Sequence, residues 1–200
     1  MRAVSVRTVA RQSGAMMIEI IIAIVIVVIG LWGVLDLQSR LHVSEMESYQ
    51  RTQALILLDD MASRIASNRA NPSLYVTDPV DGVGVDTANC GSTSAGSLDA
   101  RDEAEWCLAL KGAAEKAGVN NVGTLVGGRG CVEYIGTGGV EEYLVTVAWQ
   151  GFTPVAHPPA TVTCGQDKYN LPAGSECASS LDFCRRYVST IVRMADLTDL

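Results

Sequence analysis

An apolar run near the N-terminus dominates the pattern of hydrophobic and polar positions. It extends from Ala15 to Leu35 and holds one ionisable side chain, Glu19. The sixteen positions from 20 to 35 carry no charge and are mostly Ile, Val or Leu. A run of this length and composition is typical of a helix that crosses a membrane. A carboxylate inside such a helix costs on the order of 3 kcal/mol, so Glu19 is predicted to serve a function.

Beyond this run, an apolar stripe recurs at the spacing of a helix with one covered face. The stripe consists of Leu37, Leu41, Met46, Tyr49, Ile56, Leu57, Met61 and Ile65. Stop signals follow at Asn68, Asn71 and Pro72. The sequence therefore predicts one helix over residues 15–68, about 80 Å long at 1.5 Å per residue, whose second half packs on a head domain. The alternative is a dimerising coiled coil, which the poor heptad register disfavours.

The rest of the chain alternates between turn-rich stretches and short periodic segments. Residues 72–97 are rich in Gly, Ser, Asp and Pro and are predicted to form a loop, since their acids do not follow the spacing of a calcium loop. A second helix is predicted from its N-cap Ser97 to Gly118, the residue expected just past its C-terminus. Its expected buried face consists of Trp106, Leu110 and Ala113.

Two strand-like segments, residues 130–136 and 141–151, flank a Thr-Gly-Gly turn and predict a hairpin. The alternation of Tyr143, Val145, Val147 and Trp149 predicts one buried face. After a long loop, a last strand is predicted over residues 185–195. The expected fold class is α+β, with the long helix packed on a small antiparallel sheet.

The cysteines indicate the compartment in which the chain folds. All six cysteines follow the apolar run, which predicts a disulfide framework in an oxidising compartment rather than a metal site, because the chain has no CxxC motif. Six cysteines allow 15 pairings, of which Cys90 with Cys107 is our single prediction. The positions are Cys90, Cys107, Cys131, Cys164, Cys177 and Cys184.

The net charge of −7 becomes −10 without residues 1–14, which hold three of the 15 basic side chains and none of the 22 acidic ones. An acidic domain of this kind repels nucleic acid backbones, so no nucleic acid partner is expected. We find no catalytic or cofactor-binding constellation. His42 and His157 have no local partners, and the glycines of residues 123–130 lack the GK[ST] ending of a phosphate loop. An enzymatic function is therefore not expected.

The N-terminal segment combines a basic leader with the apolar run. The run is longer than the core of a secretory signal peptide and has no cleavage site promptly after it, whereas the Arg residues before it fit an uncleaved, positive-inside anchor. Neither a signal peptide nor a plain anchor explains why an acid stands at position 19. If the chain were cut between Gly14 and Ala15, Glu19 would be the fifth residue, and it could neutralise the α-amine of Ala15 on a neighbouring subunit.

The stretch SGAMMIEIIIAIVIVVIGLWGVLDLQ, residues 13–38, closely resembles the class III signal of type IV prepilins and pseudopilins. It departs from that pattern at Ala15, where Phe is usual, and it lacks the kinking proline of major pilins. Gly30 and Gly33 are the expected flexible points instead. The segments QALILLDDMASRIASNR, YLVTVAWQG and CRRYVSTIV resemble those of the minor pilins called PilV.

This resemblance implies a type IV pilin-like fold, cleavage after Gly14 by a prepilin peptidase, and N-methylation of Ala15. It divides the chain into a leader (1–14), a transmembrane half of the helix (15–37), a periplasmic half (38–70) and a disulfide-stabilised head (71–200). The implied location is the inner membrane, with the head in the periplasm, and then the pilus fibre on the cell surface.

The same resemblance implies a minor pilin that helps to prime pilus assembly, and with it adhesion and twitching motility. The implied partners are the major pilin, other minor pilins, the assembly platform and a tip adhesin. A minor pseudopilin of type II secretion is the alternative within the superfamily. A membrane-anchored periplasmic enzyme or binding domain is the alternative outside it.

Overall fold

The structure is a computed structural model that describes residues 13–85, 87, 89–113, 116–118, 120–121, 125–170, 174–175, 177–178 and 182–194. The chain divides into two compact units, Met1–Glu45 and Met46–Leu200. In the first unit the described residues belong to a single helix. The second unit, which we call the head, contains the described strands and the core.

The N-terminal helix α1 comprises Ser13–Ser67, so the prediction of one long helix that ends before Asn68 is confirmed. No proline interrupts it, and Gly30 and Gly33 lie within it with open space where a side chain would be. The helix closes with hydrogen bonds from the Asn68 amide to the carbonyls of Arg64 and Ile65. The short helix η1, Pro72–Tyr75, follows directly.

The head contains a four-stranded antiparallel sheet in the order β1-β4-β5-β6. Its strands are β1 (Val83–Gly84), β4 (Arg129–Tyr134), β5 (Glu141–Gln150) and β6 (Arg185–Met194). The β4–β5 hairpin and the last strand confirm two predictions. The region expected to be a loop, 72–97, also contains η1 and β1. A two-stranded pair, β2 (Lys116–Ala117) and β3 (Asn120–Asn121), completes the strands in the part of the chain described.

The second helix, α2, comprises Leu98–Leu110, which is shorter than predicted. Ser97 is its N-cap residue as expected, although its side chain makes no capping hydrogen bond. The predicted end at Gly118 is wrong, because Lys111 is the C-cap and Gly112 adopts a positive φ of 67°. Glycine takes that conformation without steric cost, so the chain leaves the helix at the first glycine that it reaches.

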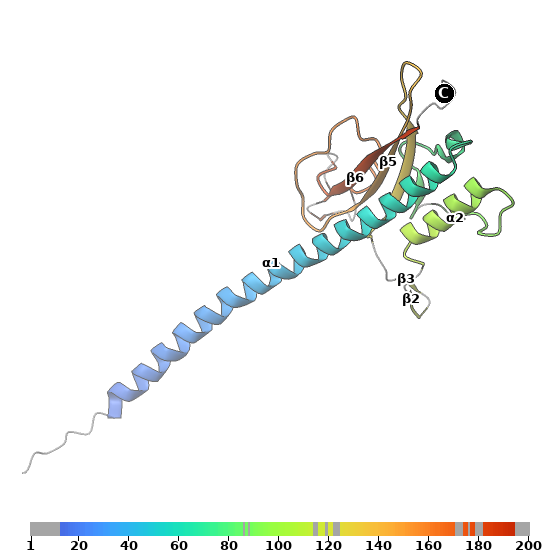
Figure 1. The fold of residues 1–200 in the computed structure, drawn as a ribbon. Coiled ribbons are helices and arrows are strands. Elements are labelled where there is room, and N and C mark those ends of the chain that lie inside the picture. The colour runs from blue at the N-terminus through green and yellow to red at the C-terminus, as the bar shows by residue number, and fades with distance from the viewer. Residues whose placement is uncertain are drawn as a thin grey trace, which may run out of the picture. The chain divides into compact units, whose positions relative to one another are not determined.

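The core lies between the last four turns of α1, helix α2 and one face of the sheet (Figure 1). Tyr143, Val145, Val147 and Trp149 are buried, which confirms the predicted face of β5. Trp106 is fully buried and donates its indole N–H to the Leu57 carbonyl at 2.9 Å. A Cβ atom at Gly130 would collide with the same indole ring, so only glycine fits there.

The predicted stripe on α1 is wrong in part. Leu57, Met61 and Ile65 are buried, but Met46, Tyr49 and Ile56 are exposed. The head instead covers Gln50, Ala54 and Leu58. Those residues are spaced by four, like Leu57, Met61 and Ile65, so the buried face follows the i, i+4 rows of the helix.

Candidate functional site

The first part of α1 presents its apolar side chains outward. Every described side chain from Met16 to His42 is exposed, and the exposed fraction is 66% for Ile29 and 73% for Trp32. β-Branched residues fill this segment, and a helix satisfies every backbone polar group without water. Within the described residues, this helix is the one long and apolar enough to cross a membrane. It is therefore a candidate membrane anchor.

Glu19 is the one acid in the described part of this apolar surface before Asp36. Its side chain is exposed, and no described residue forms a hydrogen bond or an ion pair with it. Asp36, in contrast, accepts a hydrogen bond at 3.0 Å from Nε of Arg40, one helical turn further on. A carboxylate in an apolar environment needs a donor or a cation, and the described residues offer Glu19 neither.

Gly14 and Ala15, the predicted cleavage junction, lie in the first turn of α1, and their side-chain surroundings are not part of what the structure describes. Residues 1–12 of the predicted leader lie outside the described residues. Cleavage and methylation therefore stay predictions. In the helix Ala15 and Glu19 stand four residues apart, so the two positions occupy the same face of α1.

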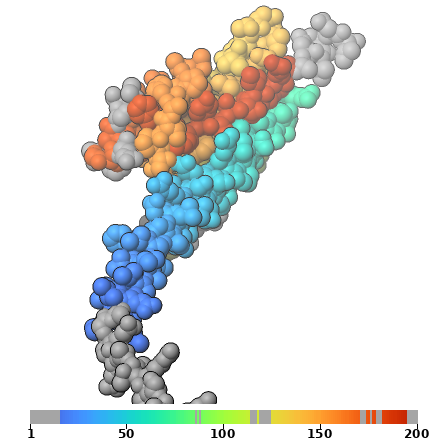
Figure 2. All heavy atoms as spheres, turned by 90° about the vertical axis from the view of Figure 1, so that its left-hand side faces the viewer, coloured from blue at the N-terminus to red at the C-terminus, as the bar shows by residue number. Residues whose placement is uncertain are grey.

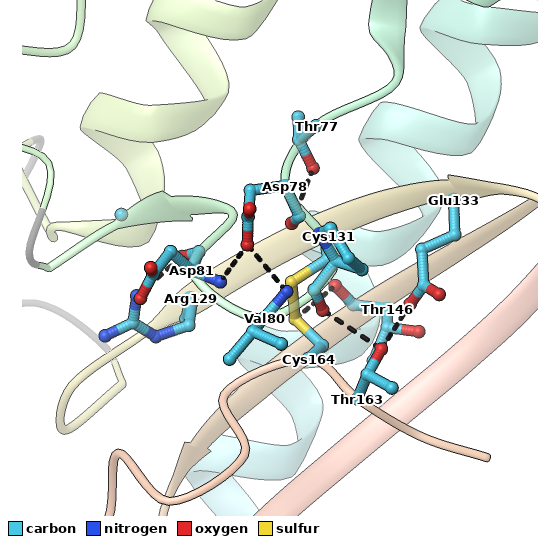
Figure 3. Close-up of a disulfide and its surroundings, with 12 residues drawn as sticks. Thr77, Asp78, Val80, Asp81, Arg129, Cys131, Glu133, Thr146, Thr163 and Cys164 are labelled. Atoms are coloured by element: carbon cyan, nitrogen blue, oxygen red, sulfur yellow. Dashed lines mark hydrogen bonds and ion pairs between the residues drawn. A yellow bond between two sulfur atoms is a disulfide. The ribbon is translucent and has the colours of Figure 1, made fainter.

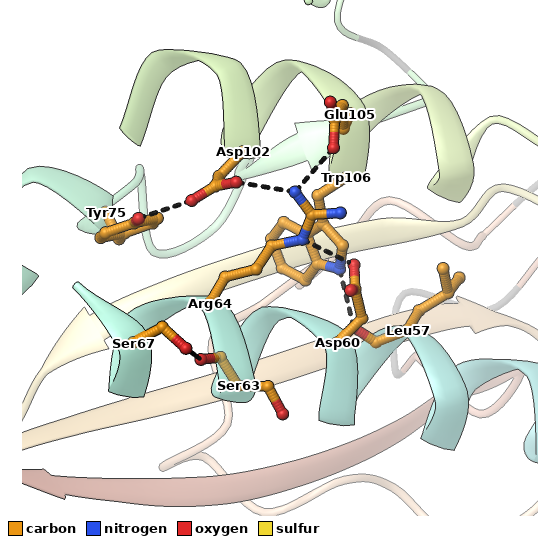
Figure 4. A network of polar contacts seen from close by, with 9 residues as sticks. All are labelled: Leu57, Asp60, Ser63, Arg64, Ser67, Tyr75, Asp102, Glu105 and Trp106. Atoms are coloured by element: carbon orange, nitrogen blue, oxygen red, sulfur yellow. Dashed lines mark hydrogen bonds and ion pairs between the residues drawn. The ribbon is translucent and has the colours of Figure 1, made fainter. Parts of the chain in front are cut away.

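A polar cluster, which sequence reasoning missed, joins α1 to α2 in the head (Figure 4). Arg64 binds Asp60 at 3.0 Å on its own helix, and Asp102 at 2.7 Å and Glu105 at 2.8 Å on α2. Burial by itself lowers the pKa of Arg64, but these hydrogen bonds outweigh it and raise the pKa above its ordinary value. The guanidinium therefore stays charged and ties the two helices together.

Asp102 accepts a second hydrogen bond, from the hydroxyl of Tyr75 in η1 at 2.7 Å. Burial and this hydrogen bond raise the pKa of Tyr75 to about 12. Asn68 also donates to the Tyr75 hydroxyl, at 3.2 Å. The cluster thus fixes the end of α1, the following turn and α2 as one rigid corner of the head.

All six cysteines form disulfides, which confirms the predicted framework. Cys90–Cys107, the predicted pair, ties the long loop to α2. Cys131–Cys164 joins β4 to the long loop before β6, and Cys177–Cys184 closes a short loop just before β6. The last two pairs could not be chosen from the sequence, because their spacing does not distinguish among the remaining pairings.

The surroundings of Cys131–Cys164 show how the loops are held (Figure 3). The carboxylate of Asp78 accepts the amides of Val80 and Asp81 at 2.8 and 2.7 Å, which folds a tight turn. These hydrogen bonds, first from Asp81 and then from Val80, lower the pKa of Asp78. Thr163 donates a hydrogen bond to Glu133 at 3.0 Å beside the disulfide. The carboxylate of Asp78 thus acts in turn formation, whereas that of Asp81 pairs with Lys168.

Buried charges hold the loop before β6, and no sequence signal pointed to them. Arg185 and Asp182 are both almost fully buried and form an ion pair at 3.2 Å. Arg185 also donates to the carbonyls of Val162 and Cys164, and Asp182 accepts the amide of Asp167. These contacts pin the loop to the start of β6.

The described residues contain no group of three or more His, Cys, Asp or Glu side chains placed to hold a metal ion. His42 lies 3.4 Å from Glu45 on the exposed surface of α1, and His157 is exposed in a loop. No protein-family model, curated protein or solved structure matches the chain. The function must therefore be argued from the residues themselves.

Proposed function

We propose that the chain is a minor subunit of a type IV pilus, of the PilV kind, with its head in the periplasm before assembly. The observation that carries this proposal is Glu19, an acid with no partner among the described residues in an outward-facing apolar helix. It stands five positions after Gly14, and Gly14 is the last residue of a basic leader. A plain membrane anchor has no use for an acid at this position.

In the proposed mechanism, a prepilin peptidase cuts after Gly14, and Ala15 acquires a cationic α-amine. Helix α1 then packs among the apolar helices of neighbouring subunits, which replace the lipid around residues 16–35. The Glu19 carboxylate of one subunit neutralises the amine of the next. Removing one partner leaves a buried charge uncompensated, at a cost of about 3–5 kcal/mol. The pair therefore fixes the axial register of helices that would otherwise slide.

The head has a different part in this proposal. Its three disulfides and the Arg64 cluster hold its loops and helices in one arrangement. The proposal places this head outside the membrane. A rigid head of this kind can present fixed surfaces to other minor pilins, the major pilin or a tip adhesin. We infer that the cluster of minor pilins primes the fibre and so supports adhesion and twitching motility.

Two measurements test the proposal. The intact mass of the membrane-extracted protein should correspond to a chain that begins at Ala15, and Glu19→Gln should reduce its amount in sheared pilus fractions by about a hundredfold or more, the equivalent of about 3 kcal/mol. The matched control is Asp36→Asn, which removes another exposed acid of α1 and should leave incorporation unchanged. The unfolding of the head should be unchanged in both variants.

An intact Met1 on functional protein, or a normal amount of the Glu19→Gln variant in fibres, would contradict the proposal. The two branches of the superfamily are separated by the phenotype of a deletion. Loss of twitching with normal protein export supports the minor pilin. Loss of export with normal twitching would assign the chain to type II secretion instead.

A further inference from the structure

We propose that the free edge of β6 is a docking site for an extended segment of another protein, which adds a strand to the sheet and carries a carboxylate near Arg51. The site lies wholly within the head. The inference does not depend on the proposed function, because it follows from residues of the head alone.

The two edges of the sheet differ in length. The β1 edge is two residues long, Val83–Gly84, and so offers little backbone to a partner. The β6 edge is ten residues long, and its register with β5 runs without a bulge from Arg185 to Met194. Proteins usually protect an edge by brevity, a bulge, a proline or a charge. The β1 edge is protected by its brevity, whereas the β6 edge has neither brevity nor a bulge.

The hydrogen-bond pattern shows which groups of β6 point away from the sheet. The Gly151 amide donates to the Cys184 carbonyl at 2.8 Å, so this is a hydrogen-bonded pair of the β5–β6 ladder. Such pairs alternate along an antiparallel ladder. The even-numbered residues of β6 therefore bond to β5, and the odd-numbered ones direct their N–H and C=O groups outward. Among the described residues, no backbone group pairs with the outward groups of Tyr187, Ser189, Ile191 and Arg193.

The composition of this edge suits strand addition. From Tyr187 to Val192 it has no charge, glycine or proline, and most of its residues favour strands. Ser189 is exposed, and Ile191 has an exposed fraction of 47%. Figure 2 shows β6, in red, at the surface of the head. An added strand would gain main-chain hydrogen bonds here, as in β-augmentation.

A cavity of about 300 Å³ at the start of β6 indicates the chemistry of the partner. It is lined by Glu47, Ser48, Arg51, Trp149, Arg186 and Tyr187. Glu47 already pairs with Arg186 at 3.1 Å, and Arg186 donates to the Thr153 carbonyl at 2.6 Å. Arg51 is exposed and forms no ion pair with a described residue. A carboxylate on the incoming strand would supply the partner that Arg51 lacks.

Charge complementarity therefore selects the occupant. Arg186 and Arg193 already pair with Glu47 at 3.1 Å and with Glu142 at 2.6 Å. Arg51 is the one of these three arginines without an acidic partner among the described residues, so the edge favours a segment that carries a carboxylate. A second copy of this chain is the alternative occupant, and the experiment below distinguishes it by its dependence on protein concentration.

The test measures hydrogen exchange of the β6 amides in the full-length protein in detergent micelles. The probe is the acetylated peptide Thr-Val-Thr-Val-Thr-Val-Asp, and the control is the same peptide N-methylated at alternate residues on the edge that would face β6. We expect the unmethylated peptide to slow exchange at Ser189 and Ile191 by about tenfold, with the even-numbered amides unchanged. The methylated peptide should slow neither. Arg51→Gln should lower the affinity for the peptide that ends in Asp. The lowered affinity should equal that of a peptide ending in Asn.

The matched variants are Ile191→Lys and Ile56→Lys, which place a lysine at two exposed isoleucines of the head. Only Ile191→Lys should abolish the slowing, because its lysine stands at the docking edge. The proposal is overturned if neither peptide slows exchange, or if both do so equally. It is also overturned if slowing appears with rising protein concentration alone, which would assign the edge to a second copy.

Discussion

The two units of the molecule differ in how far they bury residues of the same kind. In the first unit, Trp32 has an exposed fraction of 73%, whereas Trp106 in the head is fully buried. Both stand on helices. The difference lies in what surrounds them, because the head supplies a sheet and a second helix, and the described part of the first unit is a single helix. An apolar sequence makes a core only where other elements can cover it.

Ion pairs show the same contrast. Arg40 and Asp36 form a pair at 3.0 Å with side chains exposed by 78% and 67%. Arg64 in the head has three acidic partners, of which Asp102 is 10% exposed. Solvent screens the first pair and reaches the second cluster much less. The tertiary contacts that stabilise the described fold therefore lie in the head, whereas the described part of the first unit has only the hydrogen bonds and side-chain pairs of its own helix.

Substitutions of the two tryptophans should give the largest difference in the free energy of unfolding of the head. We expect Trp106→Ala to lower the free energy of unfolding of the head by about 3–5 kcal/mol, because it leaves a cavity and removes the hydrogen bond to Leu57. Trp32→Ala should leave that free energy unchanged within about 0.5 kcal/mol. Urea denaturation of the full-length protein in detergent, followed by circular dichroism of the head, measures both. A large loss with Trp32→Ala would show that the first unit contributes to the stability of the head.

The arginines should give a smaller contrast. Arg64→Met keeps the length of the side chain but leaves Asp102 with only the Tyr75 hydroxyl, so we expect a loss of about 2–3 kcal/mol. The matched change Arg40→Met breaks an exposed pair and should cost at most about 0.5 kcal/mol. The same denaturation experiment compares them. Equal losses would mean that the cluster around Arg64 is screened like a surface pair.

The sequence predicts those features that depend on periodicity. The long helix, the β4–β5 hairpin and the buried face of β5 are confirmed, because the spacing of apolar residues there has one geometric solution. Cys90–Cys107 is also confirmed, because the loop that holds Cys90 leads directly into the helix that holds Cys107. For the functional site, the sequence places Glu19 in an apolar helix, and the structure adds that it lacks a partner among the described residues.

Features that depend on tertiary contacts could not be predicted. The end of α2 at Leu110 is set by Gly112, although either glycine could have ended the helix on propensity alone. Met46 and Ile56 are exposed because the head covers a different row of α1. The buried pair of Arg185 and Asp182 is invisible to a hydropathy pattern, since charged residues are normally expected at the surface.

The smallest expected difference in stability concerns the carboxylate of Glu103. Burial, and then repulsion from Asp99, raise the pKa of the half-buried Glu103 above its usual value of 4.5. A raised folded-state pKa means that ionised Glu103 opposes folding, so stability is highest below the unfolded pKa and falls as the pH rises through the folded one. Glu103→Gln should therefore stabilise the head at pH 7, by less than about 1 kcal/mol because solvent screens the group, and not below pH 4.5. The control Glu45→Gln, in the first unit, should change neither. Denaturation at the two pH values measures the effect, and equal stabilisation at both would rule out ionisation as its cause.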